Sequence, residues 1–148
     1  MHDTNPELFN LAMSPEAQPL LDAVKKHIAE NVDPITDEFY TLQKEKEDPW
    51  VWHPRQLELL EGAKQKARDA GLWNFFLPSS EIGKGLTNLD YAYIAAELGK
   101  SPLSSQTLNC SAPDTGNMEV LERVGTPEQQ ETWLKPLLEG EIRSAYAM

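Results

Sequence analysis

The side chains that could carry out chemistry in this chain are few and lie far apart in the sequence. Its histidines are His2, His27 and His53, and none of them has the spacing of a metal-ligand pair. Cys110 is the only cysteine, and it has no obvious base beside it. We therefore predict no metal site, and we expect Cys110 to be a buried structural thiol and not a nucleophile.

Other short motifs are also better explained by structure than by catalysis. Residues 83–85, Gly-Lys-Gly, lack the length and the strand-to-helix context of a phosphate-binding loop, so we expect a flexible turn. Glu128 and Glu131 should lie on a solvated helix face. Trp50 and Trp52 could form a stacking platform, but a loop clamped onto the helices is the favoured interpretation. No self-sufficient catalytic motif is found.

Length and charge limit the possible class of protein. The chain has 148 residues, enough for one domain with a core, and its formal net charge is -11. Such a charge argues against nucleic acid and anionic membranes as partners. The mean hydropathy is -0.52, and no apolar run is long enough for a membrane span. The N-terminus lacks the features of a secretory signal, and a single cysteine allows no internal disulfide, so we expect a cytoplasmic protein.

The hydrophobic pattern predicts about six helices and an all-α fold. Helix starts are indicated at Ser14-Pro15 and near Pro54, with Asn88 and Asp114 as caps of later helices. Residues 126–129, Thr-Pro-Glu-Gln, give the clearest start signal, a capping box. A short helix around residues 106–111 is also expected. Pro34 and Pro136 should bend or break their helices, and Gly71, Gly99, Gly125 and Gly140 should end theirs.

The spacing of apolar residues predicts which side of each helix faces the core. We expect the inward positions to include Leu57, Leu60, Ala63, Ala67 and Ala70; Tyr91, Ala92, Ala95 and Leu98; Met118, Leu121 and Val124; and Trp133, Leu134, Leu137 and Leu138.

Two apolar stretches do not fit a simple helix. Residues 72–78, Leu-Trp-Asn-Phe-Phe-Leu-Pro, are too apolar for a free loop and should pack onto the bundle. Residues 142–148, Ile-Arg-Ser-Ala-Tyr-Ala-Met, have the pattern of a strand, but no other strand is predicted to pair with it. The C-terminal stretch is therefore either frayed or the beginning of a further part of a longer protein, and both stretches are candidates for an exposed apolar interface.

Four stretches in this order resemble the N-terminal region of the flavin-dependent acyl-CoA dehydrogenases. They are "GLWNFFLP" (71–78), "LDYAYIAAELGKSP" (89–102), "GTPEQQETWLKPLLEGEI" (125–142) and "RSAYAM" (143–148). In the family the last stretch continues into Thr-Glu-Pro. "CSAPDTGNMEVL" (110–121) is similar to the subgroup that acts on long or branched chains. The resemblance covers most of the chain after about residue 14.

The resemblance implies a domain organisation. Family members have an N-terminal helical domain, a middle β domain and a C-terminal four-helix bundle. Residues 1–141 then correspond to the helical domain and residues 142–148 to the start of the β domain. The family's catalytic carboxylate lies in the C-terminal domain, so no acid of this chain is nominated as the base.

The resemblance also implies an activity and its partners. The reaction is α,β-desaturation of an acyl-CoA thioester, in which a carboxylate removes the α-proton and the β-hydrogen leaves as hydride to FAD. Tyr146, Ala147 and Met148 would contact the flavin, and Gln106 and Cys110, four residues apart on one helix face, would border the acyl channel. Electron-transfer flavoprotein or a similar acceptor and a homo-oligomeric state are implied for the full-length protein.

Two alternatives remain open at this point. The chain could be a stand-alone helical interaction module without enzymatic activity. It could also belong to a related flavoprotein of the same architecture, such as an acyl-CoA oxidase or a nitroalkane oxidase, since the residues that decide between these activities lie elsewhere.

Overall fold

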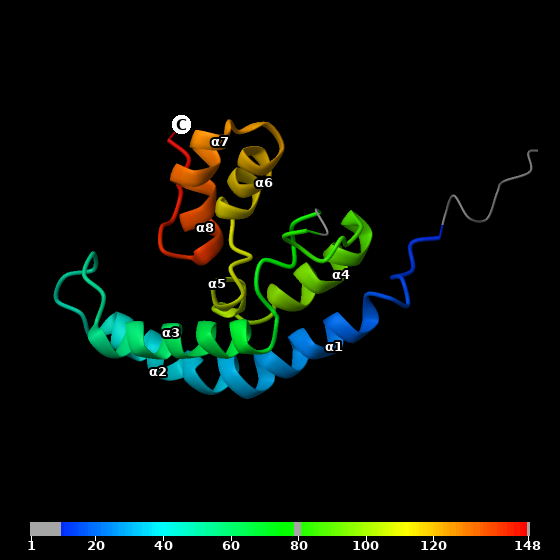
Figure 1. The fold of residues 1–148 in the computed structure, drawn as a ribbon. Coiled ribbons are helices and arrows are strands. Elements are labelled where there is room, and N and C mark those ends of the chain that lie inside the picture. The colour runs from blue at the N-terminus through cyan, green and yellow to red at the C-terminus, as the bar shows by residue number, and fades with distance from the viewer. Residues whose placement is uncertain (1–9, 79–80, 148) are drawn as a thin grey trace, which may run out of the picture.

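A helical hairpin forms the base of the molecule (Figure 1). The computed structural model describes residues 10–78 and 81–147. Helix α1 (Gln18–His27), the π-helical turn η2 (Ile28–Val32) and α2 (Asp33–Lys44) follow one another without interruption. Helix α3 (Pro54–Asp69) returns alongside them. It begins with a capping box, in which His53 accepts the N–H of Arg55 and Gln56 accepts the N–H of His53. Gly71, at a φ of +67°, then turns the chain, as predicted.

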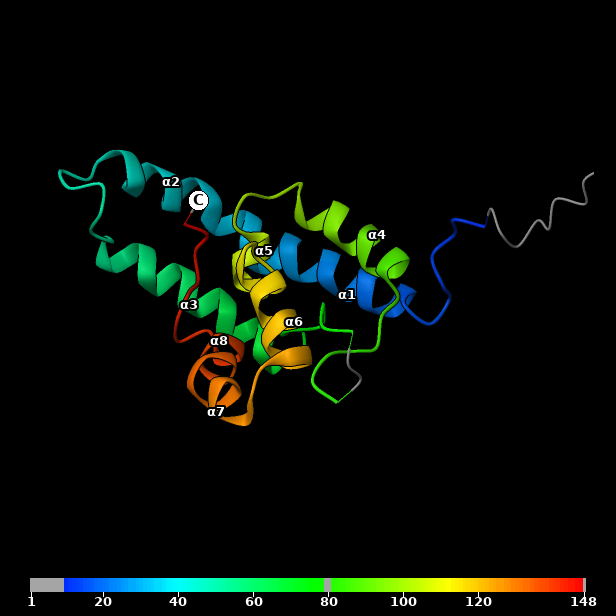
Figure 2. The same ribbon diagram turned by 90° about the horizontal axis from the view of Figure 1, so that it is seen from above.

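Shorter helices cover one side of this hairpin (Figures 1 and 2). They are α4 (Asn88–Leu98), α5 (Ser104–Thr107), α6 (Asp114–Val124) and a last segment made of α7 (Pro127–Gln129), η3 (Gln130–Leu134) and α8 (Lys135–Glu139). Helix α4 packs on α1, and α5 packs on α3 and η2. Helix α6 and the last segment stand side by side and project away from the hairpin. With each continuous segment counted once, the described residues form six helices, so the all-α prediction is confirmed.

The core lies where the hairpin meets the shorter helices. Its main cluster joins Val24 of α1, Ile94 of α4 and Met118 of α6 around Phe75 and Leu77, all of which are fully buried. Residues 72–77 therefore pack inside the molecule, as predicted, and they do not form an exposed interface. A second, smaller cluster around Val32, Phe39 and Leu60 holds the far part of the hairpin together.

Several predicted inward positions are wrong. Leu57 is 43% exposed, Trp133 55% and Val124 77%, and Ala70 and Ala92 are also exposed. Leu60, Ala63 and Ala67 of the predicted stripe of α3 are buried, so this face is correct and only its ends are exposed. The buried faces of α3 and α4 also include Gln56, Leu59 and Ile94. The weak amphipathicity of α4, with apolar residues nearly all round, left its inner face undetermined by sequence.

The two prolines that were predicted to bend or break their helices have the same surroundings. Pro34 and Pro136 each follow a π-helical turn, and the residue just before each proline bonds five residues back: Asp33 N–H to Ile28 O, and Lys135 N–H to Gln130 O. Proline has no N–H for the carbonyl four residues back, and its ring collides with that carbonyl in a regular helix. The wider turn moves this carbonyl aside, so each helical segment continues past its proline.

The C-terminal segment does not pair with a strand. α8 ends at Glu139, and Gly140 has a φ of +73°, as expected for a helix stop. Residues 142–147 form no strand, and none is present elsewhere in residues 10–78 and 81–141. In the same ranges, no helix is long and apolar enough to cross a membrane.

Candidate functional site

A groove of about 380 Å³ opens beside the C-terminal segment. Its walls come from one face of α6, from the last helical segment and from the chain beyond it, and they consist of Asn117, Val120, Leu121, Trp133, Leu137, Ile142, Arg143 and Ser144. Val120 is 58% exposed at its rim. Most of these side chains are apolar, and the groove is open to solvent. It is therefore suited to an apolar ligand or to another protein surface.

The predicted flavin-contacting residues extend from this groove. Tyr146 is 70% exposed and Ala147 is also exposed, while Met148 lies outside the described residues. The N–H and C=O groups of residues 145–147 make no hydrogen bond to any other described residue. This short stretch thus offers unpaired main-chain donors and acceptors next to an exposed aromatic ring.

A buried carboxylate holds the C-terminal segment just before this stretch. Asp114 was expected to cap α6, but it lies in the first turn and is 2% exposed. Its Oδ1 accepts the Ser144 N–H (2.7 Å) and the Ser144 hydroxyl (2.6 Å), and its Oδ2 accepts the Nε–H of Arg143. Nothing in the local sequence predicted this role, because the partners are about 30 residues away.

Gln106 and Cys110 do not share a helix face. Helix α5 ends at Thr107, and Asn109 has a φ of +56°, so the chain reverses before Cys110. Gln106 is half-buried, and its carboxamide has no hydrogen-bond partner among the described residues. The Cys110 thiol is buried and donates to the Leu108 carbonyl, and burial raises its pKa far above the ordinary range. The prediction of a buried, unreactive thiol is confirmed.

The histidines have structural surroundings. His53 caps α3. His27 is 3% exposed, its Nδ1 faces Asn31, and its Nε2 is buried with no hydrogen-bond partner among the described residues. Burial and, to a lesser extent, the nearby Lys66 ammonium lower the pKa of His27, so it is neutral at physiological pH. His2 lies outside the described residues. Among residues 10–78 and 81–147, no three potential metal ligands cluster.

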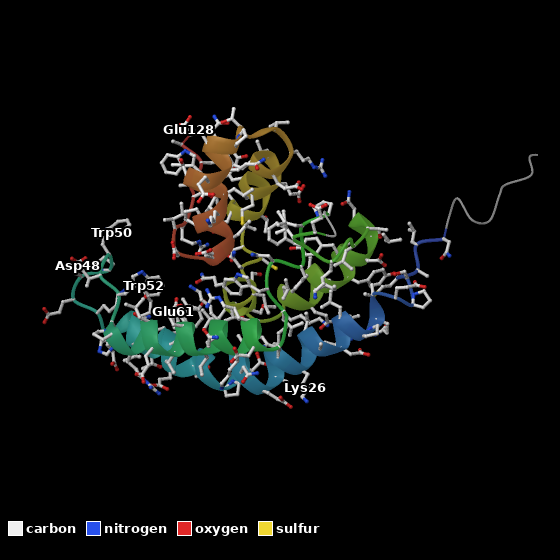
Figure 3. The ribbon with its side chains drawn as sticks, in the orientation of Figure 1. Lys26, Asp48, Trp50, Trp52, Glu61 and Glu128 are labelled. Atoms are coloured by element: carbon white, nitrogen blue, oxygen red, sulfur yellow. The ribbon has the colours of Figure 1, made fainter. Side chains whose placement is uncertain are left out.

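The tryptophans of the α2–α3 loop divide in two (Figure 3). Trp52 folds back onto the hairpin, with its ring 5.8 Å from that of Phe39 and with Lys46 above it. Trp50 is 91% exposed and points away from the helices. The predicted clamp therefore consists of Trp52 alone. The Gly-Lys-Gly stretch follows a turn at residues 81–82 and is itself irregular. Gly83 packs so closely on the Leu77 carbonyl that no Cβ would fit.

A side-chain network missed by the sequence reasoning holds the end of α8. Asn109 Nδ2 donates to the Leu137 carbonyl (2.9 Å) and to Asn74 Oδ1 (2.7 Å). Asn74 Nδ2 and Trp73 Nε1 both donate to the Leu138 carbonyl at 2.7 Å. These bonds satisfy carbonyls that a helix C-terminus leaves unpaired. They also fix the position from which the C-terminal segment leaves α8.

Comparison with protein families gives a match over nearly the whole chain. Residues 14–141 match the family model described as the acyl-CoA dehydrogenase N-terminal domain. Acyl-CoA dehydrogenase family member 10 of Mus musculus is 44% identical over 141 residues, covering 92% of this chain and 13% of that protein. Family member 11 of Gallus gallus is 43% identical over 150 residues, covering 99% and 18%.

A solved structure has the same fold. The "Structure of a putative acyl-CoA dehydrogenase from Mycobacterium abscessus" superposes with a TM-score of 0.80 at 43% sequence identity, covering 89% of this chain and 33% of that one. The chain thus spans less than a fifth of the length of these two curated relatives and a third of the solved one.

Proposed function

The chain belongs to the acyl-CoA dehydrogenase family, and from this membership we propose that the full-length protein is a FAD-dependent enzyme that desaturates an acyl-CoA thioester between its α and β carbons. Residues 1–141 are its N-terminal helical domain, and residues 142–148 lead into the middle β domain. The family match over residues 14–141 is the observation that carries this proposal.

The C-terminal segment has the chemistry that a flavin ring requires. The main-chain groups of residues 145–147 are unpaired within the described part of the chain and can serve the polar edge of the isoalloxazine. Tyr146 offers an aromatic face beside it. When bound, FAD supplies the acceptor for the hydride that leaves the β-carbon. The part of this chain is to hold the ring and to keep water away from it.

The helical domain contributes walls and not a base. Gln106 has a free carboxamide for the substrate, whereas Cys110 is buried in the main core cluster and would support the channel wall from behind. Among the buried acids, Asp114 is fully engaged by Arg143 and Ser144. Hydrogen bonds from the Ser14 N–H and the Thr87 hydroxyl lower the pKa of Asp90, which makes it a weak base. We therefore place the catalytic carboxylate outside this chain.

The remaining partners follow from the family. Electron-transfer flavoprotein or a similar acceptor reoxidises the flavin, and the full-length protein is a homo-oligomer. A cytoplasmic location is a separate proposal, which rests on the single cysteine and not on the family. A related flavoprotein oxidase of the same architecture is the alternative, since it would use the same helical domain.

Comparison of the full-length protein with residues 1–148 tests this function. The full-length protein should retain FAD, and acyl-CoA substrates of several chain lengths should bleach the flavin absorbance under nitrogen. Residues 1–148 with added FAD and an artificial electron acceptor should give no turnover. Failure of every acyl-CoA to bleach the flavin would overturn the proposal, and rapid reoxidation by oxygen would identify an oxidase. Turnover by residues 1–148 alone would show that the base lies within this chain.

A further inference from the structure

The buried carboxylate of Asp114 has more partners than a helix start needs. We propose that Asp114 is a positioning residue, which anchors Arg143 and Ser144 so that the main chain of Tyr146 and Ala147 is held in one place for the flavin. The anchoring itself follows from the contacts of this chain, whereas its use for the flavin rests on the function proposed above.

Both oxygens of Asp114 are committed to the C-terminal segment. Oδ1 takes the backbone N–H and the hydroxyl of Ser144, and Oδ2 takes Arg143 Nε–H. Hydrogen bonds with an ionised acceptor are about twice as strong as neutral ones. Because the side chain of Asp114 is 2% exposed, water does not compete for these positions.

A second side chain of α6 completes the anchor. Asn117, one turn after Asp114, donates from Nδ2 to Ser144 Oγ at 2.8 Å. The hydroxyl of Ser144 therefore donates to one residue of α6 and accepts from another. Two contacts from a rigid helix, together with the bond to the backbone N–H, fix both the position and the orientation of residue 144.

The anchor is the last fixed point before the exposed stretch. Residues 145–147 make no hydrogen bond to the rest of the described chain. Tyr146 lies two residues beyond Ser144, which is about 7 Å along an extended chain. Over such a short distance, loss of the anchor at Ser144 moves the main chain of Tyr146 and Ala147 directly.

Helix stabilisation alone does not account for this arrangement. An acid in the first turn interacts favourably with the helix dipole without any side-chain partner. Glu128, in the first turn of α7, is such a residue: it is exposed and has no ion pair or side-chain hydrogen bond with other described residues. Asp114 also lies in the first turn at the start of its helix but is buried and paired. Glu128 is therefore a matched control.

Amide hydrogen exchange of residues 1–148 tests the anchor. The Ser144 N–H should exchange at least about tenfold faster in Asp114→Asn. The asparagine side chain has an NH2 group in place of one carboxylate oxygen, so one of the donors from Arg143 or Ser144 loses its acceptor and faces another donor. The exchange of the Ser144 N–H should be unchanged in Glu128→Gln. Ser144→Ala leaves Asp114 in place as the acceptor for the N–H of residue 144, so the amide exchange of this residue should accelerate less. Unchanged exchange in both Asp114→Asn and Ser144→Ala would overturn the anchor.

Flavin spectroscopy of the full-length protein tests the positioning role. Asp114→Asn should lose at least about tenfold in FAD affinity or shift the flavin absorption spectrum, while its thermal midpoint and that of Glu128→Gln show whether the fold is kept. Faster Ser144 exchange together with an unaltered spectrum and unaltered FAD affinity would overturn the positioning role. If wild-type protein binds no FAD at all, the proposed function fails, while the exchange data still decide whether the anchor exists.

Discussion

Two asparagines, Asn74 and Asn109, bind the end of α8 and also turn the backbone at their own positions in the chain. Asn74 and Asn109 both have a φ of +56°, which asparagine tolerates better than other non-glycine residues. Their side chains bond to each other and to the carbonyls of Leu137 and Leu138. Each asparagine thus combines a turn in the backbone with a pair of buried hydrogen bonds.

Replacement of Asn109 by alanine should be strongly destabilising. The change leaves Asn74 Oδ1 without its donor and removes one of the two donors of the Leu137 carbonyl, which keeps the Gly140 N–H. It also places an apolar residue with a Cβ at positive φ. We expect the free energy of unfolding to fall by about 2–4 kcal/mol, measured by urea denaturation. Asn109→Gly loses the same hydrogen bonds without the strain, so it should be about 1 kcal/mol more stable than Asn109→Ala. Equal stability of the two variants would show that the backbone contributes nothing.

The sequence could not have indicated this network. Asn74 stands within an apolar stretch and Asn109 within an expected short helix, and neither position has a local turn signal. Their partners lie 28 to 64 residues away, so only the tertiary structure brings them together. The error about Gln106 and Cys110 has the same origin, because Asn109 reverses the chain between them.

Helix boundaries were predicted best where the signal is local. The capping box at Thr126 is present as expected: Thr126 accepts the Gln129 N–H and Gln129 accepts the Thr126 N–H. His53 was missed as the cap of α3 because histidine is not among the usual capping residues. Thr87, and not Asn88, caps α4, an error of one residue between two side chains that can both serve.

Removal of the Thr126 cap should weaken the last helical segment. In Thr126→Ala the Gln129 N–H loses its acceptor at an exposed helix start, so the free energy of unfolding should fall by about 1 kcal/mol in urea denaturation. Thr126→Ser keeps the hydroxyl and should lie within a few tenths of a kcal/mol of wild type. A loss of the same size in both variants would point to the methyl group of Thr126 instead of the hydrogen bond.

At the scale of the whole molecule, only one of the two predicted interface stretches is exposed. Residues 72–78 were a candidate interface, but Leu72 and the residues from Phe75 to Leu77 are buried between the hairpin and the shorter helices. Periodicity identifies a buried face but not the element that covers it, so a strongly apolar connection could be assigned to either the core or an interface. The other predicted stretch, residues 142–148, contributes Ile142 to the groove, where Val120 and Trp133 add further exposed apolar side chains.

This groove should make residues 1–148 self-associate. Burial of its apolar side chains between two copies is favourable by about 25 cal/mol per Å², and it is opposed by the repulsion between chains of net charge -11. Static light scattering should therefore show a molecular mass that rises with protein concentration and rises further with added salt, which screens the repulsion.

In Trp133→Ala, which removes a 55% exposed side chain from the groove, the rise should be smaller. Trp50→Ala removes a more exposed tryptophan at the far end of the hairpin and should behave as wild type (Figure 3). A chain that stays monomeric at every concentration, or that responds to Trp50→Ala and not to Trp133→Ala, would contradict the assignment of the groove as the adhesive surface.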